Sequence, residues 1–119
     1  MNENEERTLK AEVVQVFSAD DLIVLVDLGV ENLFKKQRVR LHGVDAPNAV
    51  RSGPETTAGK LRSYVKSLCK GKTLRLEIKS RGVSSWVVDA WVINDDGLEK
   101  NLNEDLKAQG FAYKRENSA

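Results

Sequence analysis

Between residues 9 and 41 the apolar residues come in short, β-branched runs, and this pattern constrains the fold more than any other feature of the chain. Polar breaks, SADD at residues 18–21 and GVEN at residues 29–32, separate these runs. In the next segment, residues 36–43 (KQRVRLHG), Arg38 and Arg40 share one face with His42, and apolar residues occupy the other. Alternation of this kind between turns predicts a meander of three strands.

The period changes at Ser52. From there to Lys70 the apolar residues recur every three or four positions, which predicts a helix from about Pro54 to Cys69, with Ser52 or Gly53 as its cap. Two alternating segments, residues 72–79 and 85–93, predict two further strands, and residues 94–97 (NDDG) predict a turn. A short helix is expected from about Leu102 to Ala108, with Gly110 as its stop.

This order of three strands, a helix, two strands and a helix predicts an α+β, mainly β fold. The arrangement is a five-stranded antiparallel barrel of the OB type, with a helix between strands three and four and a short C-terminal helix. We expect residues 1–8 to be a disordered tail, residues 9–115 the domain and residues 116–119 a second tail. The chain has 119 residues, enough for one core.

Composition excludes several classes of protein. No apolar run approaches the roughly 20 residues that a membrane-spanning helix needs, and the acidic start, MNENEER, is unlike a secretion signal. The sequence therefore predicts a cytoplasmic protein without a membrane partner. Its one cysteine, Cys69, excludes an internal disulfide and a cysteine-based metal site. The net charge of +1 is weak support for a nucleic-acid partner, although cations gather between residues 60 and 81.

Five segments, in order along the chain, resemble motifs of the staphylococcal nuclease (thermonuclease) family. The most specific is RLHGVDAP at residues 40–47, which resembles the family's R-L-x-G-I/V-D-x-P-E. The other four are VFSADDLI at residues 16–23, GPETTA at residues 53–58, AWVINDDG at residues 90–97 and NEDLKAQGFA at residues 103–112. The resemblance covers residues 9–115 and implies an OB-fold domain that acts on nucleic acid.

The resemblance implies a site as well as a fold. The family cleaves DNA and RNA phosphodiesters with calcium, held by two aspartates and a backbone carbonyl. Carried over to this chain, the metal positions are Asp20, Asp45 and the carbonyl of Ala46. Arg40 takes the place of the first phosphate-binding arginine. The spacing suits the chemistry, because calcium needs several oxygens and an arginine can bind a second phosphate oxygen.

Two positions depart from the family pattern. Asn48 stands where the family has its general base, a glutamate, and an amide cannot accept a proton from water; losing a general base costs ~10²–10⁴ in rate. Val87 stands at the place of the second arginine when residues 83–87 (VSSWV) are aligned without a gap with the family's D-x-Y-G-R turn. Arg81 and Glu55 are possible substitutes for the arginine and the base. We expect any Ca²⁺ binding to be weak, because two carboxylates give calcium few charged ligands.

Two hypotheses follow. In the first, the catalytic centre is degenerate and the chain binds nucleic acid, single-stranded DNA or RNA, or a protein partner. In the second, it is an active Ca²⁺-dependent endonuclease that uses substitute residues. The expected nucleic-acid-binding residues are Lys60, Lys66, Lys70 and Trp86. Simpler interpretations stay open: the lysines as a solvated helix face, the aspartates as turn residues, and His42 and the tryptophans as structural.

Overall fold

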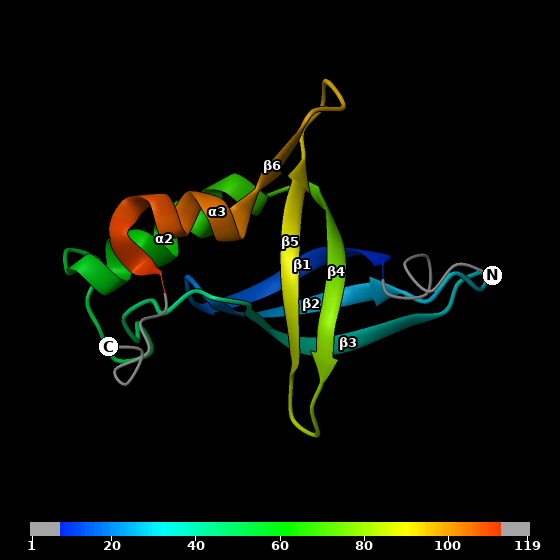
Figure 1. Ribbon diagram of the computed structural model, residues 1–119, viewed down its shortest axis with the longest axis horizontal. Coiled ribbons are helices and arrows are strands. Elements are labelled where there is room, and N and C mark those ends of the chain that lie inside the picture. The colour runs from blue at the N-terminus through cyan, green and yellow to red at the C-terminus, as the bar shows by residue number, and fades with distance from the viewer. Residues whose placement is uncertain (1–7, 113–119) are drawn as a thin grey trace, which may run out of the picture.

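In the computed structural model, which describes residues 8–112, a six-stranded sheet curls into a barrel with two helices on one side (Figure 1). The strands are β1 (Thr8–Ser18), β2 (Asp21–Asp27), β3 (Phe34–Leu41), β4 (Thr73–Arg81), β5 (Trp86–Ile93) and β6 (Glu99–Asn101). The helices are α2 (Thr57–Cys69) and α3 (Leu102–Leu106), and the latter runs on into a π-helical turn, η1 (Lys107–Phe111). The predicted order of strands and helices is confirmed, and β6 is an addition.

The strand order is β3-β2-β1-β4-β5-β6, and a further pairing of β3 with β5 closes five strands into the barrel. Every neighbouring pair in that order is antiparallel, but the closing pair is parallel, with Val39 opposite Trp86 and Arg40 opposite Val87. The expectation of a wholly antiparallel barrel is therefore wrong at the seam. The OB-type architecture itself is confirmed, since five strands form a barrel with a helix between β3 and β4.

Alternate residues of the strands fill the barrel. The inner face of β3 carries Gln37, Val39 and Leu41, all buried, while Arg38 and Arg40 are exposed, as the alternation predicts. From α2 the core receives one apolar stripe: Ala58, Leu61, Val65 and Cys69. Burial raises the pKa of the Cys69 thiol to about 11, so it packs as a small apolar residue.

The first turn of α2 lies three residues later than the sequence predicts. Its cap is Thr56, whose Oγ1 accepts a hydrogen bond from the Gly59 N–H at 3.0 Å and donates one to the Gly53 carbonyl at 2.7 Å. The predicted caps at Ser52 and Gly53 are therefore wrong: Thr56 satisfies a free N–H of the first turn, and the Gly53 backbone packs against Gly59.

The C-terminal segment departs from a simple helix. α3 is capped by Asn101, whose Oδ1 accepts from the Glu104 N–H at 2.9 Å. The helix then widens into η1, in which Gly110 has φ 101° and leaves the helical conformation. The expected glycine stop is thus present, because a left-handed backbone favours glycine. The expected tails lie outside the described residues, except that Thr8 is the first residue of β1.

A buried amide joins α3 to the barrel. The Asn103 side chain is 1% exposed. It accepts from the Ala90 N–H at 2.9 Å and donates to the carbonyls of His42 and Val88 at 2.9 and 3.1 Å. These bonds connect α3 with β5 and with the end of β3.

Among the described residues, no helix is long and apolar enough to cross a membrane.

Replacing Gly59 with alanine should destabilise the fold, although alanine is the better helix former. A Cβ at Gly59 would lie 2.1 Å from the Gly53 carbonyl oxygen, which is backbone and cannot rotate away. Overpacking of this kind costs about 1–3 kcal/mol, against a helix-propensity gain of about 1 kcal/mol. Urea unfolding measures the net change. The control, Ser63→Ala on the exposed face of α2, should change stability by no more than ~0.5 kcal/mol.

Asn103→Ala should be far more costly than the loss of a helix cap. The substitution leaves the buried Ala90 N–H without its acceptor and removes the donor to two carbonyls. Because an unsatisfied buried group costs about 1–3 kcal/mol, we expect a total loss of about 3 kcal/mol or more. Asn101→Ala, which removes only the cap of α3, should cost ~1 kcal/mol. Equal losses in thermal unfolding would contradict the anchoring role of Asn103.

Candidate functional site

The turn between β1 and β2 carries a buried carboxylate. Asp20 is 4% exposed, and its backbone carbonyl accepts from the Leu41 N–H at 2.9 Å, which fixes the turn to the end of β3. Its Oδ2 lies 3.4 Å from the Ala46 backbone nitrogen and 3.6 Å from Nη2 of Arg40. The structure therefore brings together three of the predicted positions: Asp20, Arg40 and Ala46.

The surroundings of Asp20 act on its charge in opposite directions. Burial raises the pKa of Asp20 above its ordinary value, because desolvation disfavours the carboxylate. The Ala46 N–H and the Arg40 guanidinium oppose this rise, and the neighbouring Asp21 adds to it. Asp20 is therefore a buried acid whose ionised form costs stability, a property that is concentrated at functional sites.

Asp45 lies in the loop after β3. Its side chain is exposed, and its backbone N–H donates to the Phe111 carbonyl at 2.8 Å. A bridge between Val44 and Ala112 adds to this attachment, so the C-terminal segment holds the start of the loop. Farther along, the Ala49 N–H donates to the buried Oγ of Ser18 at 2.9 Å. Ser18 thus anchors the loop to the β1–β2 turn.

Arg40 is the exposed cation of this group. Its side chain is 54% exposed on the outer face of β3. In the parallel β3–β5 ladder its partner is Val87, so the two side chains lie on the same face of adjacent strands. Val87 therefore occupies a position from which an arginine could join Arg40, and it offers an apolar side chain there.

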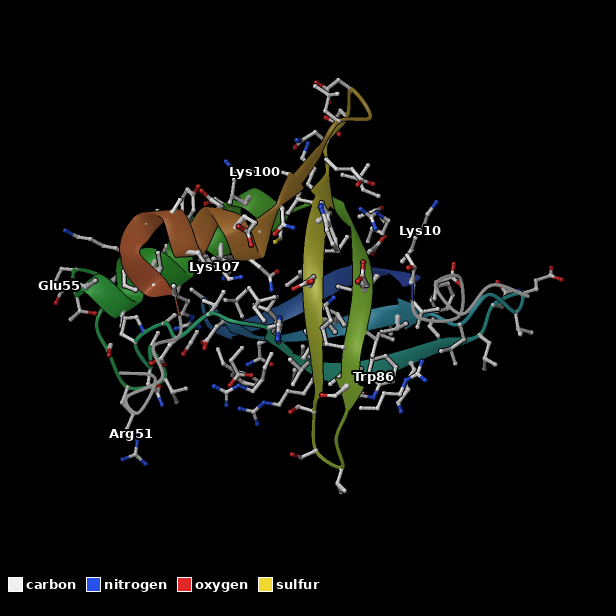
Figure 2. The ribbon with its side chains drawn as sticks, in the orientation of Figure 1. Lys10, Arg51, Glu55, Trp86, Lys100 and Lys107 are labelled. Carbon is white, nitrogen blue, oxygen red and sulfur yellow. The ribbon has the colours of Figure 1, made fainter. Side chains whose placement is uncertain are left out.

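Asn48 and Glu55 lie farther along the loop between β3 and α2. The Asn48 Oδ1 accepts from the Val50 N–H at 2.9 Å, which makes Asn48 a turn residue with its amide oxygen in use. Glu55 is exposed just before α2, and its carboxylate lies close to Gly53. Figure 2 shows Glu55 at the outer end of the molecule, on the opposite side from Trp86.

Arg81 and Trp86 contact each other. The Trp86 ring is buried, and Cζ of Arg81 lies 5.1 Å from its centroid. A bulge in β4 between Ile78 and Ser80 places Arg81 opposite Trp86, while Ser80 is opposite Val87. Arg81 therefore lies on the same face of the hairpin as Trp86, and Ser80 lies on the same face as Val87. Trp86 is only 7% exposed and two cations lie over its ring, in keeping with the structural interpretation of this tryptophan, and its part in binding nucleic acid stays a prediction.

The three lysines predicted to bind nucleic acid, Lys60, Lys66 and Lys70, are exposed on α2 and at its end. The helix contains no acid between Thr57 and Cys69. Arg62 on the same helix is committed to the fold, because its Nε donates to the Val16 carbonyl at 2.9 Å. These lysines are carried by α2 and its end, whereas Arg40 is carried by β3.

Sequence reasoning missed the acid that faces His42. Nδ1 of His42 lies 3.8 Å from Asp89, whose carboxylate also contacts Nζ of Lys79 at 3.3 Å and accepts from the Asn103 amide at 3.0 Å. Asp89 stands in the middle of β5, where aspartate is disfavoured, and that misfit is the signal that could have identified it. The cluster adjoins Arg40 and Val87 on the outer face of the same strands.

The calcium ligands implied by the resemblance fit poorly. Oδ2 of Asp20 faces the Ala46 N–H at 3.4 Å and Nη2 of Arg40 at 3.6 Å, so a cation on this oxygen would share it with both groups. Asp21 is bound by Arg38 through two hydrogen bonds of 2.9 and 2.6 Å. Within residues 8–112 no three His, Cys, Asp or Glu side chains come together in a group that could hold a metal ion. Weak calcium binding therefore stays a prediction.

Comparison with known proteins adds no family to this geometry. No protein-family model matches the sequence. The search of curated proteins finds no significant match. The resemblance to staphylococcal nucleases therefore remains a prediction that rests on the five motifs.

Asp20→Asn should leave stability at pH 7 unchanged or higher. Because the pKa of Asp20 is raised, the folded chain binds its proton more tightly than the unfolded chain does. Wild-type stability should therefore fall as pH rises from about 4 through the folded pKa of Asp20. The asparagine keeps an oxygen that can accept from the Ala46 N–H. Because it does not titrate, it also removes the loss of stability that the ionisation of Asp20 causes as pH rises. Urea unfolding at pH 4 and pH 7 measures both effects.

The neighbouring acid provides the matched control. Asp21→Asn disrupts the bidentate ion pair in which Arg38 donates to both carboxylate oxygens of Asp21. This change should destabilise the chain by about 1–3 kcal/mol at pH 7. Destabilisation by Asp20→Asn as large as that by Asp21→Asn would show that Asp20 serves the fold and would contradict its assignment as a functional acid.

Proposed function

We propose that the chain is a thermonuclease-like OB domain that binds single-stranded nucleic acid and hydrolyses it very slowly or not at all. The observation that carries the proposal is the exposed guanidinium of Arg40, on the outer face of β3 beside the β1–β2 turn. OB barrels bind single strands on this face, between the β1–β2 and β4–β5 loops.

The contacts of Arg40 leave it able to bind a phosphate. Its ion pair with Asp20, at 3.6 Å, is longer than a hydrogen bond, and the side chain is half exposed. A guanidinium with free donors matches two phosphate oxygens at once. Arg38, two residues earlier, has its Nε and Nη2 turned toward Asp21, so Arg40 is the better phosphate ligand of the two.

Two features favour binding over hydrolysis. The amide oxygen of Asn48 is bonded within its own turn and is no proton acceptor at neutral pH. Beside Arg40 the apolar Val87 provides no second positive charge for a transition state; losing such a group costs about 10²–10³ in rate. The substitutes are poorly placed: Arg81 lies over Trp86, and Glu55 lies in the exposed loop before α2.

The alternative function is an active Ca²⁺-dependent endonuclease. It is favoured by Asp20, a buried acid retained although its charge is costly, close to Arg40 and to the loop that carries Asp45. Calcium chemistry there would rest on Asp20, Asp45 and the Ala46 carbonyl, a set that fits poorly as the chain stands. Turnover in calcium separates the two functions. A protein ligand is the third outcome, indicated by a failure to bind nucleic acid.

We expect wild-type chain to bind single-stranded oligothymidylate in EDTA, with affinity that falls steeply as salt rises. Arg40→Ala should weaken binding roughly tenfold or more, because charged hydrogen bonds contribute about 1.5–3 kcal/mol each. Fluorescence anisotropy measures both effects, and Lys10→Gln, an exposed charge on β1, is the control. Equal affinity of Arg40→Ala and wild type would contradict the site.

In calcium we expect very slow cleavage of single-stranded DNA and RNA or none. The double variant Asn48→Glu with Val87→Arg restores a proton acceptor and a second arginine beside Arg40, and any gain in turnover should depend on Arg40. Robust wild-type cleavage that disappears in EDTA and in Arg40→Ala would overturn the non-hydrolytic reading and establish the nuclease.

A further inference from the structure

Two cations share one buried indole at the start of β5. Nζ of Lys35 lies 5.2 Å from the centroid of the Trp86 ring, and Cζ of Arg81 lies 5.1 Å from it. The ring is 7% exposed, whereas Lys35 and Arg81 are both exposed. These three residues, the Trp86 clamp below, come from β3, β4 and β5 and meet beside the β4–β5 loop, where Figure 2 labels Trp86.

The fold determines which residues meet here. The parallel β3–β5 ladder begins at Val39 opposite Trp86, so the earlier part of β3, which carries Lys35, extends past the start of β5. The bulge in β4 after Ile78 puts Arg81, rather than Ser80, opposite Trp86. Both cations are thus brought to the indole by strand register, and their placement does not depend on a flexible loop.

The charges of the clamp are unbalanced. Among the described residues, neither Lys35 nor Arg81 has an acidic side chain within ion-pair distance. The indole attracts each cation through its π face, by about 0.5–1 kcal/mol at exposed sites, but it neutralises neither. Like charges held on one ring repel each other. A bound anion would relieve that repulsion, and phosphate suits both side chains.

We propose that the Trp86 clamp is a second phosphate subsite for the single-stranded nucleic acid that Arg40 binds. The inference rests on the proposed function and extends it along the strand. Trp86 and Val87 are consecutive in β5 and lie opposite Val39 and Arg40, so the backbones of the two sites are one ladder step apart while their side chains are on opposite faces of the strands, and a nucleic acid bound at both would pass around the β4–β5 loop. The adjoining loop, residues 82–85 (GVSS), contains no acid that would repel a backbone phosphate.

The clamp contacts the nucleic-acid backbone rather than a base. Base stacking needs an open aromatic face, and this ring is almost wholly buried, with cations 5.1 and 5.2 Å from its centroid. The exposed groups here are an ammonium and a guanidinium, which are phosphate ligands. Binding through them carries no sequence preference, since phosphate contacts position a strand without reading it.

The test is a salt titration of oligothymidylate binding in EDTA, with Lys35→Gln and Arg81→Gln. Each variant should weaken binding several-fold at low salt. Each should also lower the slope of log affinity against log salt by ~0.7 for the phosphate contact it loses. The matched control is Lys10→Gln, an exposed lysine that lies on β1 apart from Trp86 in Figure 2, and it should leave the slope unchanged.

Tryptophan fluorescence gives a second, local readout. In Trp91→Phe, which leaves Trp86 as the remaining tryptophan, oligothymidylate should change the emission, and Arg81→Gln should reduce that change. Thermal unfolding checks that each variant is folded. Arg81→Lys, which keeps the charge, should retain most of the salt slope.

The outcomes separate the two proposals. If the Lys35 and Arg81 variants keep the wild-type slope while Arg40→Ala weakens binding, the clamp is overturned and the proposed function stands. If the wild type does not bind oligothymidylate at low salt, the proposed function fails and the clamp fails with it. Loss of slope in both clamp variants, and not in Lys10→Gln, supports the subsite.

Discussion

The amide of Asn103 makes hydrogen bonds to three backbone groups from two segments: the carbonyl of His42, which follows β3, and a carbonyl and an N–H of β5. β3 and β5 meet only through a short parallel ladder of three residue pairs. That ladder is the weakest closure of the barrel, since it has the fewest pairs. Because the buried Asn103 side chain bonds to both segments where the ladder ends, it stabilises the pairing of β3 with β5. It also attaches α3 to these strands.

The candidate site depends on this seam. Arg40 and Val87 are paired across it, and Trp86 begins it. The β1–β2 turn is attached to the same place, because the Leu41 N–H donates to the Asp20 carbonyl. Three features thus share one structural support: a buried acid of raised pKa, an exposed arginine and a pair of cations on an indole. Electrostatic groups held this firmly are pre-organised for a charged ligand.

Much of the fold could be predicted from the period of the apolar residues, because burial of one face selects it. The parallel closure could not, since a strand's own alternation does not show which edge it pairs with. At the site, Asp20, Arg40 and Ala46 could be placed together from the spacing of the motif and its resemblance. Arg81 and Trp86 could not, because the bulge after Ile78 inverts the alternation of β4, and a bulge leaves no clear mark in a period-two pattern. The cap at Thr56 was missed because Ser52 and Gly53 offered equally good local chemistry.

The attachment of the Asp45 loop to the C-terminal segment has a consequence for the order in which the protein is made. Phe111 and Ala112 hold Asp45 and Val44, yet they are synthesised after every strand of the barrel. A chain emerging from the ribosome can pair β1 with β2 and β3 while this loop is still unattached, because these strands are synthesised before Phe111 and Ala112. The loop that carries Asp45 and Ala46 is therefore attached after Arg40 and Asp20, which the pairing of β1, β2 and β3 already holds together.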